Sequence, residues 1–194
     1  MNRIILASQS PRRRELIRSI TDNYEVIAAP VEEILPEGLP AEQAPVYLAR
    51  LKARAVAGSH PGRVVIGADT VVILDNKVLG KPLNAADAAA MLRMLSGRVH
   101  TVITGCCLAF ACDQCDTVEK TFSQTTLVRF YPLSEREIEA YIATGEPMDK
   151  AGSYGIQGKG GLFVEWIRGD YFNVMGLPVA RLNRELHELM NTIG

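Results

Sequence analysis

Apolar residues follow two kinds of pattern along this chain, and the first predicts β-strands. Continuous or alternating apolar runs bounded by turn residues are typical of strands in a buried or half-buried sheet. Such runs occupy residues 3–8, 24–30, 63–75, 99–111 and 117–131, and a short returning strand at 78–82 follows a turn at 75–77.

The second pattern places apolar residues three and four positions apart and predicts helices. These cover residues 10–19, 40–58, 84–97 and 134–145 and a C-terminal segment that begins near Pro178. Ser10 and Asn84 suit N-caps, and Ser134 with Glu137 forms a capping box. Strands that alternate with helices and hairpins predict a mixed α/β sheet. No internal repeat or long linker divides the sequence, so one domain over residues 1–194 is expected.

The start of the first predicted helix carries three consecutive arginines, residues 12–14, after Ser10 and Pro11. Cations are unfavourable in a first helical turn because the helix dipole is already positive there. Either solvent absorbs this cost or the helix start holds an anion. Successive helical residues point about 100° apart, so the three arginines cannot all face one ligand, and Arg14 is predicted to be solvated.

Asp69 stands inside an apolar run, "VVIGADTVVIL". An ionised carboxylate buried among such residues costs several kcal/mol unless it is paired or binds a metal. Two interpretations follow: Asp69 ends a strand and caps a neighbouring loop, or it is a metal ligand or general base in a cleft. Gly67 beside it permits either a β-bulge or a close approach of another backbone.

Other charged residues fit the second interpretation. Glu33 follows a predicted strand, Lys52 lies on a predicted helix, Lys81 lies in a turn and Lys159 stands between glycines. Each lysine taken alone is more simply explained as a solvated surface charge. Together with the arginines and the two carboxylates, they form the set of groups that binds a polyphosphate with magnesium.

Composition and charge narrow the classes of function. The chain has 194 residues and a formal net charge of −1, which argues against a general nucleic-acid binder. No secretory signal and no apolar run of about 18 residues is visible, so a cytoplasmic protein without a membrane partner is expected.

Motifs for several other chemistries are missing from the sequence. It contains no G-x-G-x-x-G after a strand, no P-loop and no G-x-S-x-G elbow, and its three histidines lack metal spacing. A hydrolytic nucleophile would therefore be water, activated by Asp69, by a metal or by both.

Four cysteines cluster at positions 106, 107, 112 and 115. Cys112 and Cys115 have C-x-x-C spacing, which is compatible with zinc or redox chemistry. They lie between two predicted strands, so a hairpin tip that happens to carry cysteines is the alternative. Cys106 and Cys107 would point to opposite faces of a strand and would not share one metal.

Several segments in a fixed order resemble the Maf family of nucleoside triphosphate pyrophosphatases. They are "SQSPRR" at 8–13, "VEE" at 31–33, "LARLKA" at 48–53, "GADT" at 67–70, "LGKP" at 79–82, "SGRVHTVITG" at 96–105, "DKAGSYGIQG" at 149–158 and "GDYFNVMGLP" at 169–178. The resemblance implies a Maf/Ham1-like α/β fold, with a mixed twisted sheet, flanking helices and two lobes around a nucleotide-binding cleft. It also implies a homodimer.

The same resemblance implies an activity and assigns residues to it. A nucleoside triphosphate would be cleaved between its α and β phosphates, giving the monophosphate and pyrophosphate. Asp69 would accept the proton and, with Glu33, would bind a divalent metal cation, Mg2+ or Mn2+. The residues expected to face or hold the phosphates are Ser8, Ser10, Arg13, Lys52 and Lys81.

The segment "AGSYGIQGKG" resembles the branch of the family that acts on dTTP and UTP. Positions associated with base selectivity correspond to Arg12, Thr70 and Gln157. Uracil and thymine present an acceptor–donor–acceptor edge, and a glutamine amide offers one donor and one acceptor. Cytosine reverses part of that edge and would leave buried groups unpaired.

The sequence therefore predicts a pyrophosphatase for dTTP, UTP and modified pyrimidine nucleotides. Two alternatives belong to other classes. One is a regulatory interaction protein in cell-division arrest, and the other is a nucleotide sensor that binds without turnover.

Overall fold

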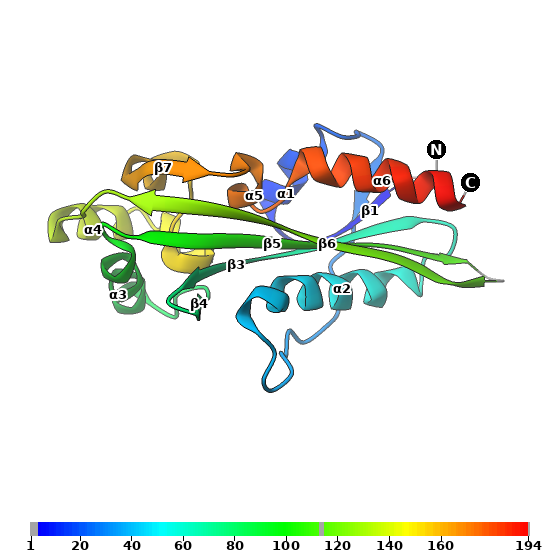
Figure 1. Cartoon of the computed structure of the whole chain (residues 1–194), viewed down its shortest axis with the longest axis horizontal. Helices are drawn as coiled ribbons and strands as arrows, with labels where there is room; N and C mark the ends of the chain where they lie inside the picture. The colour runs from blue at the N-terminus through cyan, green and yellow to red at the C-terminus, as the bar shows by residue number, and fades with distance from the viewer. Residues whose placement is uncertain (1–3, 113–114, 194) are drawn as a thin grey trace. The chain divides into compact units, whose positions relative to one another are not determined.

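The computed structural model describes residues 4–112 and 115–193, and for residues 115 and 116 it describes the backbone alone. The strands are β1 Ile4–Ala7, β2 Tyr24–Val26, β3 Val64–Leu74, β4 Lys77–Leu79, β5 Val99–Cys112, β6 Cys115–Phe130 and β7 Val164–Arg168 (Figure 1). The α-helices are α1 Pro11–Ile17, α2 Ala44–Ala57, α3 Ala85–Leu95, α4 Glu135–Ile142, α5 Tyr171–Met175 and α6 Val179–Ile193. Short 3-10 helices cover η1 Ala41–Gln43, η2 Glu146–Asp149, η3 Ala151–Ser153 and η4 Gly158–Phe163.

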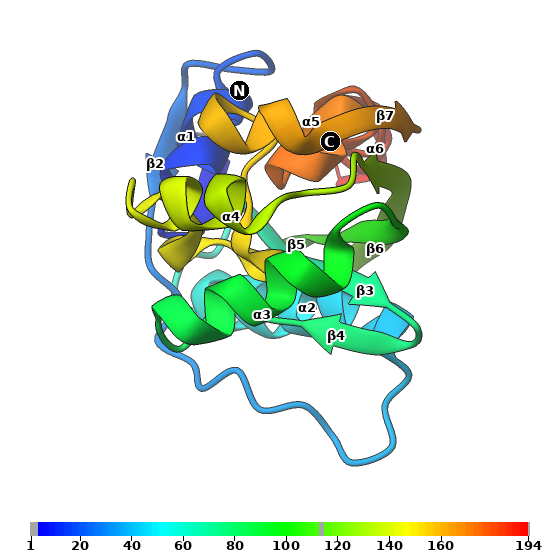
Figure 2. The same ribbon diagram turned by 90° about the vertical axis from the view of Figure 1, so that its left-hand side faces the viewer.

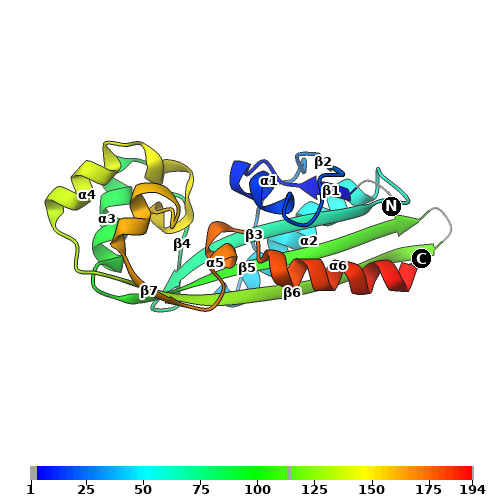
Figure 3. The same cartoon turned by 90° about the horizontal axis from the view of Figure 1, so that it is seen from above.

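Within the described residues the strands form one seven-stranded sheet. Its order is β2-β1-β3-β5-β6-β7, and β4 pairs with β3. β1 runs parallel to both β2 and β3, whereas β4 is antiparallel to β3 and β7 is antiparallel to β6 (Figure 3). The predicted mixed α/β sheet is confirmed.

The chain divides into two compact units, which are described separately. Unit 1 comprises residues 1–69, 104–124 and 176–194, and unit 2 comprises residues 70–103 and 125–175. Strands β3, β5 and β6 contribute residues to both units. The expectation of a single domain stays a prediction.

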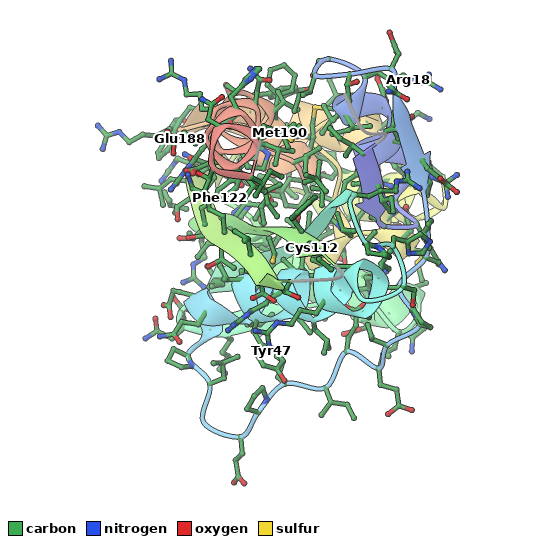
Figure 4. All side chains as sticks on the ribbon, turned by 90° about the vertical axis from the view of Figure 1, so that its right-hand side faces the viewer. Arg18, Tyr47, Cys112, Phe122, Glu188 and Met190 are labelled. Carbon is green, nitrogen blue, oxygen red and sulfur yellow. The ribbon has the colours of Figure 1, made fainter. Side chains whose placement is uncertain are left out.

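In unit 1, α2 and α6 cover opposite faces of the sheet (Figure 1). Glycines let α2 come unusually close: a Cβ on Gly67 would lie 2.1 Å from the Ala49 carbonyl oxygen, and one on Gly105 would lie 2.3 Å from the backbone of Pro45. The close approach predicted at Gly67 is confirmed. Figure 4 shows Phe122 of β6 on the side of α6, where the Arg181 guanidinium lies 4.9 Å from the centre of its ring.

Unit 2 has its own apolar core. It includes the fully buried Leu92, Leu95 and Ile138, together with Phe130 and the buried Phe163. α3 and α4 are neighbouring helices (Figure 2). The Arg93 guanidinium joins them by donating to both carboxylate oxygens of Glu135, at 2.8 and 2.7 Å.

Most predicted elements and caps are present. Ser10 and Asn84 accept hydrogen bonds from the backbone N–H groups of Arg13 and Asp87, and the capping box of Ser134 and Glu137 is formed. Prediction failed between residues 152 and 178, where the glycine-rich sequence hides β7, α5 and two 3-10 helices. The glycines interrupt the apolar periodicity of this segment. Close backbone contacts at the glycines, which leave no pattern of side chains in the sequence, hold it together.

Cys106 and Cys107 are free, buried thiols, and burial raises the pKa of each to about 12. A thiol that stays protonated is a poor metal ligand or nucleophile, so both are core residues. Cys112 is disulfide-bonded. The interpretation of the hairpin tip stays a prediction, because residues 113 and 114 and the Cys115 side chain lie outside the described residues. No helix in the described part of the chain is both long and apolar enough to cross a membrane.

Candidate active site

The carboxyl end of β1 lies beside the middle of β3, and this pairing brings the first site residues together. The two strands are parallel, and Ala7 pairs with Gly67, so Ser8 and Ala68 follow side by side. Ser8 is buried, and its Oγ accepts a hydrogen bond from Ser10 N at 3.2 Å. Ser10 then caps α1, so the chain turns directly from the strand into the arginine-bearing helix.

Arg13 is anchored by three hydrogen bonds within unit 1. Its Nε donates to the Gly176 carbonyl at 2.7 Å, and its Nη1 donates to the Ala68 carbonyl at 2.8 Å and to Ser8 Oγ at 3.4 Å. Burial lowers the pKa of Arg13 below its ordinary value, and the negative charge of Asp69 opposes that change. The guanidinium is therefore held in one place, close to the carboxylate that the sequence singled out.

The two other arginines of α1 have different surroundings. Arg14 is exposed, as the helical spacing predicts, and Arg12 is half-buried. Two kinds of surroundings thus stabilise the cations in this helical turn. Solvent surrounds Arg14, and backbone carbonyls surround Arg13.

Lys52 forms ion pairs with both predicted metal ligands. Its Nζ lies 2.7 Å from Asp69 Oδ1 and 2.9 Å from Glu33 Oε2. The Lys52 and Asp69 side chains are 12% and 14% exposed, whereas Glu33 is 51% exposed, so this group lies at the boundary between core and solvent. Gly67 makes the pair possible, because the close approach of α2 brings Lys52 over the strand that carries Asp69.

The structure decides between the two interpretations of Asp69 as far as its position is concerned. Asp69 lies in the middle of β3, five residues before its end at Leu74, and its carboxylate accepts a hydrogen bond from Lys52. The alternative in which Asp69 ends a strand and caps a loop is therefore wrong. Lys52 likewise is not a solvated surface charge.

Glu33 and Asp69 have the donor chemistry of a magnesium or manganese site. Both present carboxylate oxygens to the same ammonium group, so the two carboxylates face one small volume. Among the described residues no cluster of three or more His, Cys, Asp or Glu side chains is arranged to hold a metal. A site with only two protein carboxylates suits Mg2+, which takes its remaining ligands from phosphate oxygens and water.

Three of the predicted site residues belong to unit 2. Thr70 is half-buried on β3, Lys81 is exposed just after β4, and Gln157 is half-buried at the N-cap of η4. Lys159, the weaker candidate, is exposed. Unit 1 thus brings together Ser8, Arg13, Glu33, Lys52 and Asp69, and it also contains Ser10 and Arg12. The other predicted site residues belong to unit 2.

Comparison with known proteins identifies the family. Residues 3–189 match the family described as "Maf-like protein". The chain belongs to the Maf family.

Curated relatives of this Maf protein carry one shared name over almost its whole length. A "dTTP/UTP pyrophosphatase" of Bacillus velezensis (strain DSM 23117 / BGSC 10A6 / LMG 26770 / FZB42) is 52% identical over 186 residues and covers 96% of each chain. Another of that name, from Geobacillus sp. (strain WCH70), is 50% identical over 189 residues, or 97% of this chain and 99% of the relative.

A solved structure supports the fold of this Maf protein. The HAM1 protein from Coxiella burnetii is 15% identical, with a TM-score of 0.51 over 97% of this chain and 100% of that chain. The expected Maf/Ham1-like fold class is confirmed.

Two features of this Maf protein were missed by sequence reasoning. The carbonyl groups of Ala68 and Gly176 hold Arg13, and no side-chain pattern marks a backbone acceptor. The second is Glu146, whose carboxylate contacts the glycine-rich segment around Gln157. Its signal was present as an acidic residue in the turn "TGEP", but turns are so often acidic that the position did not stand out.

Proposed function

We propose that this Maf protein hydrolyses dTTP and UTP, and modified pyrimidine nucleotides, to the monophosphate and pyrophosphate. Relatives at about 50% identity over nearly the full chain share the name dTTP/UTP pyrophosphatase. The structural observation that carries the proposal is the pairing of Lys52 with both Asp69 and Glu33, near the fixed guanidinium of Arg13. Cations and carboxylates held together in this way suit a phosphate anhydride and a divalent metal.

The cationic groups bind the triphosphate in this proposal. Lys52 and Arg13 neutralise phosphate oxygens, and Ser8 and Ser10 line the loop that faces the phosphates. Lys81 is assigned to phosphate binding as a further cation. Support comes from the half-buried position of Lys52, since an ammonium shielded from water interacts more strongly with an anion.

Asp69 accepts the proton of the attacking water. Water attacks the α-phosphorus, the bond from that phosphorus to the bridging oxygen breaks, and pyrophosphate leaves with the electron pair. Lys52 donates a hydrogen bond to Asp69 Oδ1 at 2.7 Å and holds the carboxylate in position for this step.

Glu33 and Asp69 would hold the divalent cation, Mg2+ or Mn2+. When bound, the cation supplies positive charge to phosphate oxygens as negative charge develops on the leaving pyrophosphate. Lys52 contacts the same two carboxylates, so its ammonium group balances part of their charge and orients both.

Base selectivity is assigned to Arg12, Thr70 and Gln157. The amide of Gln157 pairs with the uracil or thymine edge by giving one donor and one acceptor. An enzyme of free nucleotides requires neither nucleic acid nor membrane. A cytoplasmic homodimer is the expected form, which light scattering of the purified protein would test.

The test is pyrophosphate release from a panel of nucleoside triphosphates, with Mg2+ or Mn2+ and with neither. We expect release from dTTP and UTP to exceed release from CTP and the purine nucleotides, and to stop when the cation is chelated. Tight binding of UTP without pyrophosphate release would identify a sensor instead. A protein that neither binds nor hydrolyses these nucleotides would contradict the proposal and favour a regulatory interaction role.

A further inference from the structure

The glycine loop, residues 155–161, is held in unit 2 by the carboxylate of Glu146. Oε1 of Glu146 accepts hydrogen bonds from the Tyr141 hydroxyl at 2.9 Å and from Gly160 N at 3.3 Å. Oε2 accepts from Lys159 N at 3.1 Å. One side chain therefore binds two backbone donors of the loop and one phenol.

Tyr141 and Lys150 fix the beginning of the same loop. The Tyr141 hydroxyl, which donates to Glu146, accepts a hydrogen bond from Gly155 N at 3.1 Å. Lys150 Nζ donates to the Glu146 carbonyl at 2.6 Å, and its side chain packs so closely that a Cβ on Gly155 would lie 2.7 Å from Cε. Both ends of the glycine loop are thus tied to Glu146.

The loop also folds tightly on itself. A Cβ on Gly160 would lie 2.4 Å from the Gly155 carbonyl oxygen, and one on Gly161 would lie 2.6 Å from the Ile156 carbonyl oxygen. Gly158 has a φ of 76°, a left-handed conformation that favours glycine. The backbone near Gln157 is therefore packed too closely for larger residues to replace these glycines without a shift of the loop.

This arrangement decides what the glycine loop can bind. Glycine-rich turns bind phosphate when their backbone N–H groups converge on the anion. Here the N–H groups of Gly155, Lys159 and Gly160 already donate to Tyr141 and Glu146. A phosphate at that place would also meet the negative charge of Glu146. These three N–H groups are therefore already engaged, and the half-buried side chain of Gln157 is the candidate of the loop for contact with a ligand.

We propose that Glu146 is a positioning residue for base selectivity: its carboxylate, with the Tyr141 hydroxyl, fixes the glycine loop so that the Gln157 amide reads uracil and rejects cytosine. The inference rests on the proposed function, and in particular on the role of Gln157. To read the base, the amide must lie at hydrogen-bonding distance and angle from its edge, and the backbone of the glycine loop sets where the Gln157 side chain begins. Selectivity therefore depends on how firmly the backbone beneath Gln157 is held.

The experiment measures the ratio of kcat/KM for UTP to that for CTP, with both nucleotides competing in one reaction. This ratio does not depend on the fraction of correctly folded enzyme, so a merely structural defect leaves it unchanged. The variants are Glu146→Ala and Tyr141→Phe, with Gln157→Ala as the reference. Glu139→Ala is the matched control, because Glu139 is an exposed carboxylate on the same helix as Tyr141.

We expect Glu146→Ala to lower the ratio roughly tenfold, about the value of one well-formed hydrogen bond. Tyr141→Phe should lower it by a smaller factor, and Glu139→Ala should leave it unchanged. If Glu146→Ala does not fold, Tyr141→Phe decides, since it removes only one hydroxyl. A ratio within twofold of wild type in the folded variants, together with a lowered ratio in Gln157→Ala, would overturn the proposal. Wild-type protein that shows no preference for UTP would reject the proposed function itself.

Discussion

Asp69 and Glu146 are both carboxylates at the boundary between core and solvent, yet their partners differ in kind. Asp69 pairs with the ammonium group of Lys52, which it shares with Glu33. Glu146 accepts hydrogen bonds from two backbone N–H groups and a tyrosine hydroxyl. An ammonium on a flexible stem can turn to another anion, whereas a backbone N–H cannot move without its loop.

This difference separates a carboxylate that can take part in a reaction from one that stabilises a loop conformation. In the proposed function the partner of Asp69 also binds phosphate, so the same three side chains would rearrange around a substrate. The partners of Glu146 are used up within the fold, and its charge stabilises one loop conformation. Burial alone does not distinguish these cases; the mobility of the partner does.

The strongest test of the contrast is Asp69→Asn. The amide is isosteric with the carboxylate but cannot accept the proton of water, so kcat for UTP should fall by about 10²-fold or more. Asp75→Asn is the matched control, since Asp75 is an exposed carboxylate paired with Arg98 in unit 2. Steady-state pyrophosphate release gives both rates. A kcat for Asp69→Asn close to that of the control would remove Asp69 from the chemical step.

A smaller effect is expected from Gly67→Ala, which tests how the charged group of unit 1 is assembled. The added methyl would lie 2.1 Å from the Ala49 carbonyl oxygen, so α2 must move away from β3. Overpacking of this kind should lower the free energy of unfolding by about 2–3 kcal/mol and separate Lys52 from Asp69.

Urea denaturation measures the loss of stability, and Gly58→Ala provides the control within the same region of the chain. A Cβ on Gly58 would lie 3.9 Å from its nearest neighbour, the Arg54 carbonyl oxygen, so the stability of this variant should stay within about 0.5 kcal/mol of wild type. Equal urea midpoints for the Gly67 and Gly58 variants would show that the position of α2 does not require a glycine at residue 67.

The smallest predicted effect concerns pH and the core behind the glycine loop. His100 is buried, its Nε2 lies 2.8 Å from the Tyr154 hydroxyl, and burial lowers the pKa of His100 to about 4. The unfolded chain binds the proton near the ordinary pKa of 6.5, so stability is complete above that pH and falls as the pH drops toward 4. Between pH 6 and pH 5 the loss should be about 1 kcal/mol.

Urea midpoints at pH 6 and pH 5 measure this loss. His100→Gln should remove most of the difference between the two midpoints, because the titrating group is gone. His187→Gln should keep it, since His187 is exposed. An unchanged pH difference in the His100 variant would contradict the assignment.

Side-chain chemistry allowed much of unit 1 to be predicted. A carboxylate among valines and isoleucines needs a partner, and a glycine two residues before it permits a close helix; both facts are visible in the sequence around Asp69. The pairing with Lys52 follows from them once α2 lies on β3. The anchoring of Arg13 could not be predicted, because its acceptors are backbone carbonyls that every residue possesses.

The glycine-rich part of unit 2 was much less predictable. Its strand β7, "VEWIR", shows no clear alternation of buried and exposed positions, and α5 is only five residues long. The order of the glycine loop comes from hydrogen bonds between the Glu146 side chain and backbone N–H groups. Such bonds join residues more than ten positions apart and leave no periodic signal.

The hydrogen bond from Arg13 to the Gly176 carbonyl joins the first helix to the segment just before the last one. A ribosome makes the donor early and the acceptor late, so the guanidinium lacks this partner until translation is almost finished. A chain truncated by a stop codon ahead of Gly176 would retain the serine and arginine signature near its start, yet its Arg13 would lack one of the three hydrogen bonds that anchor it.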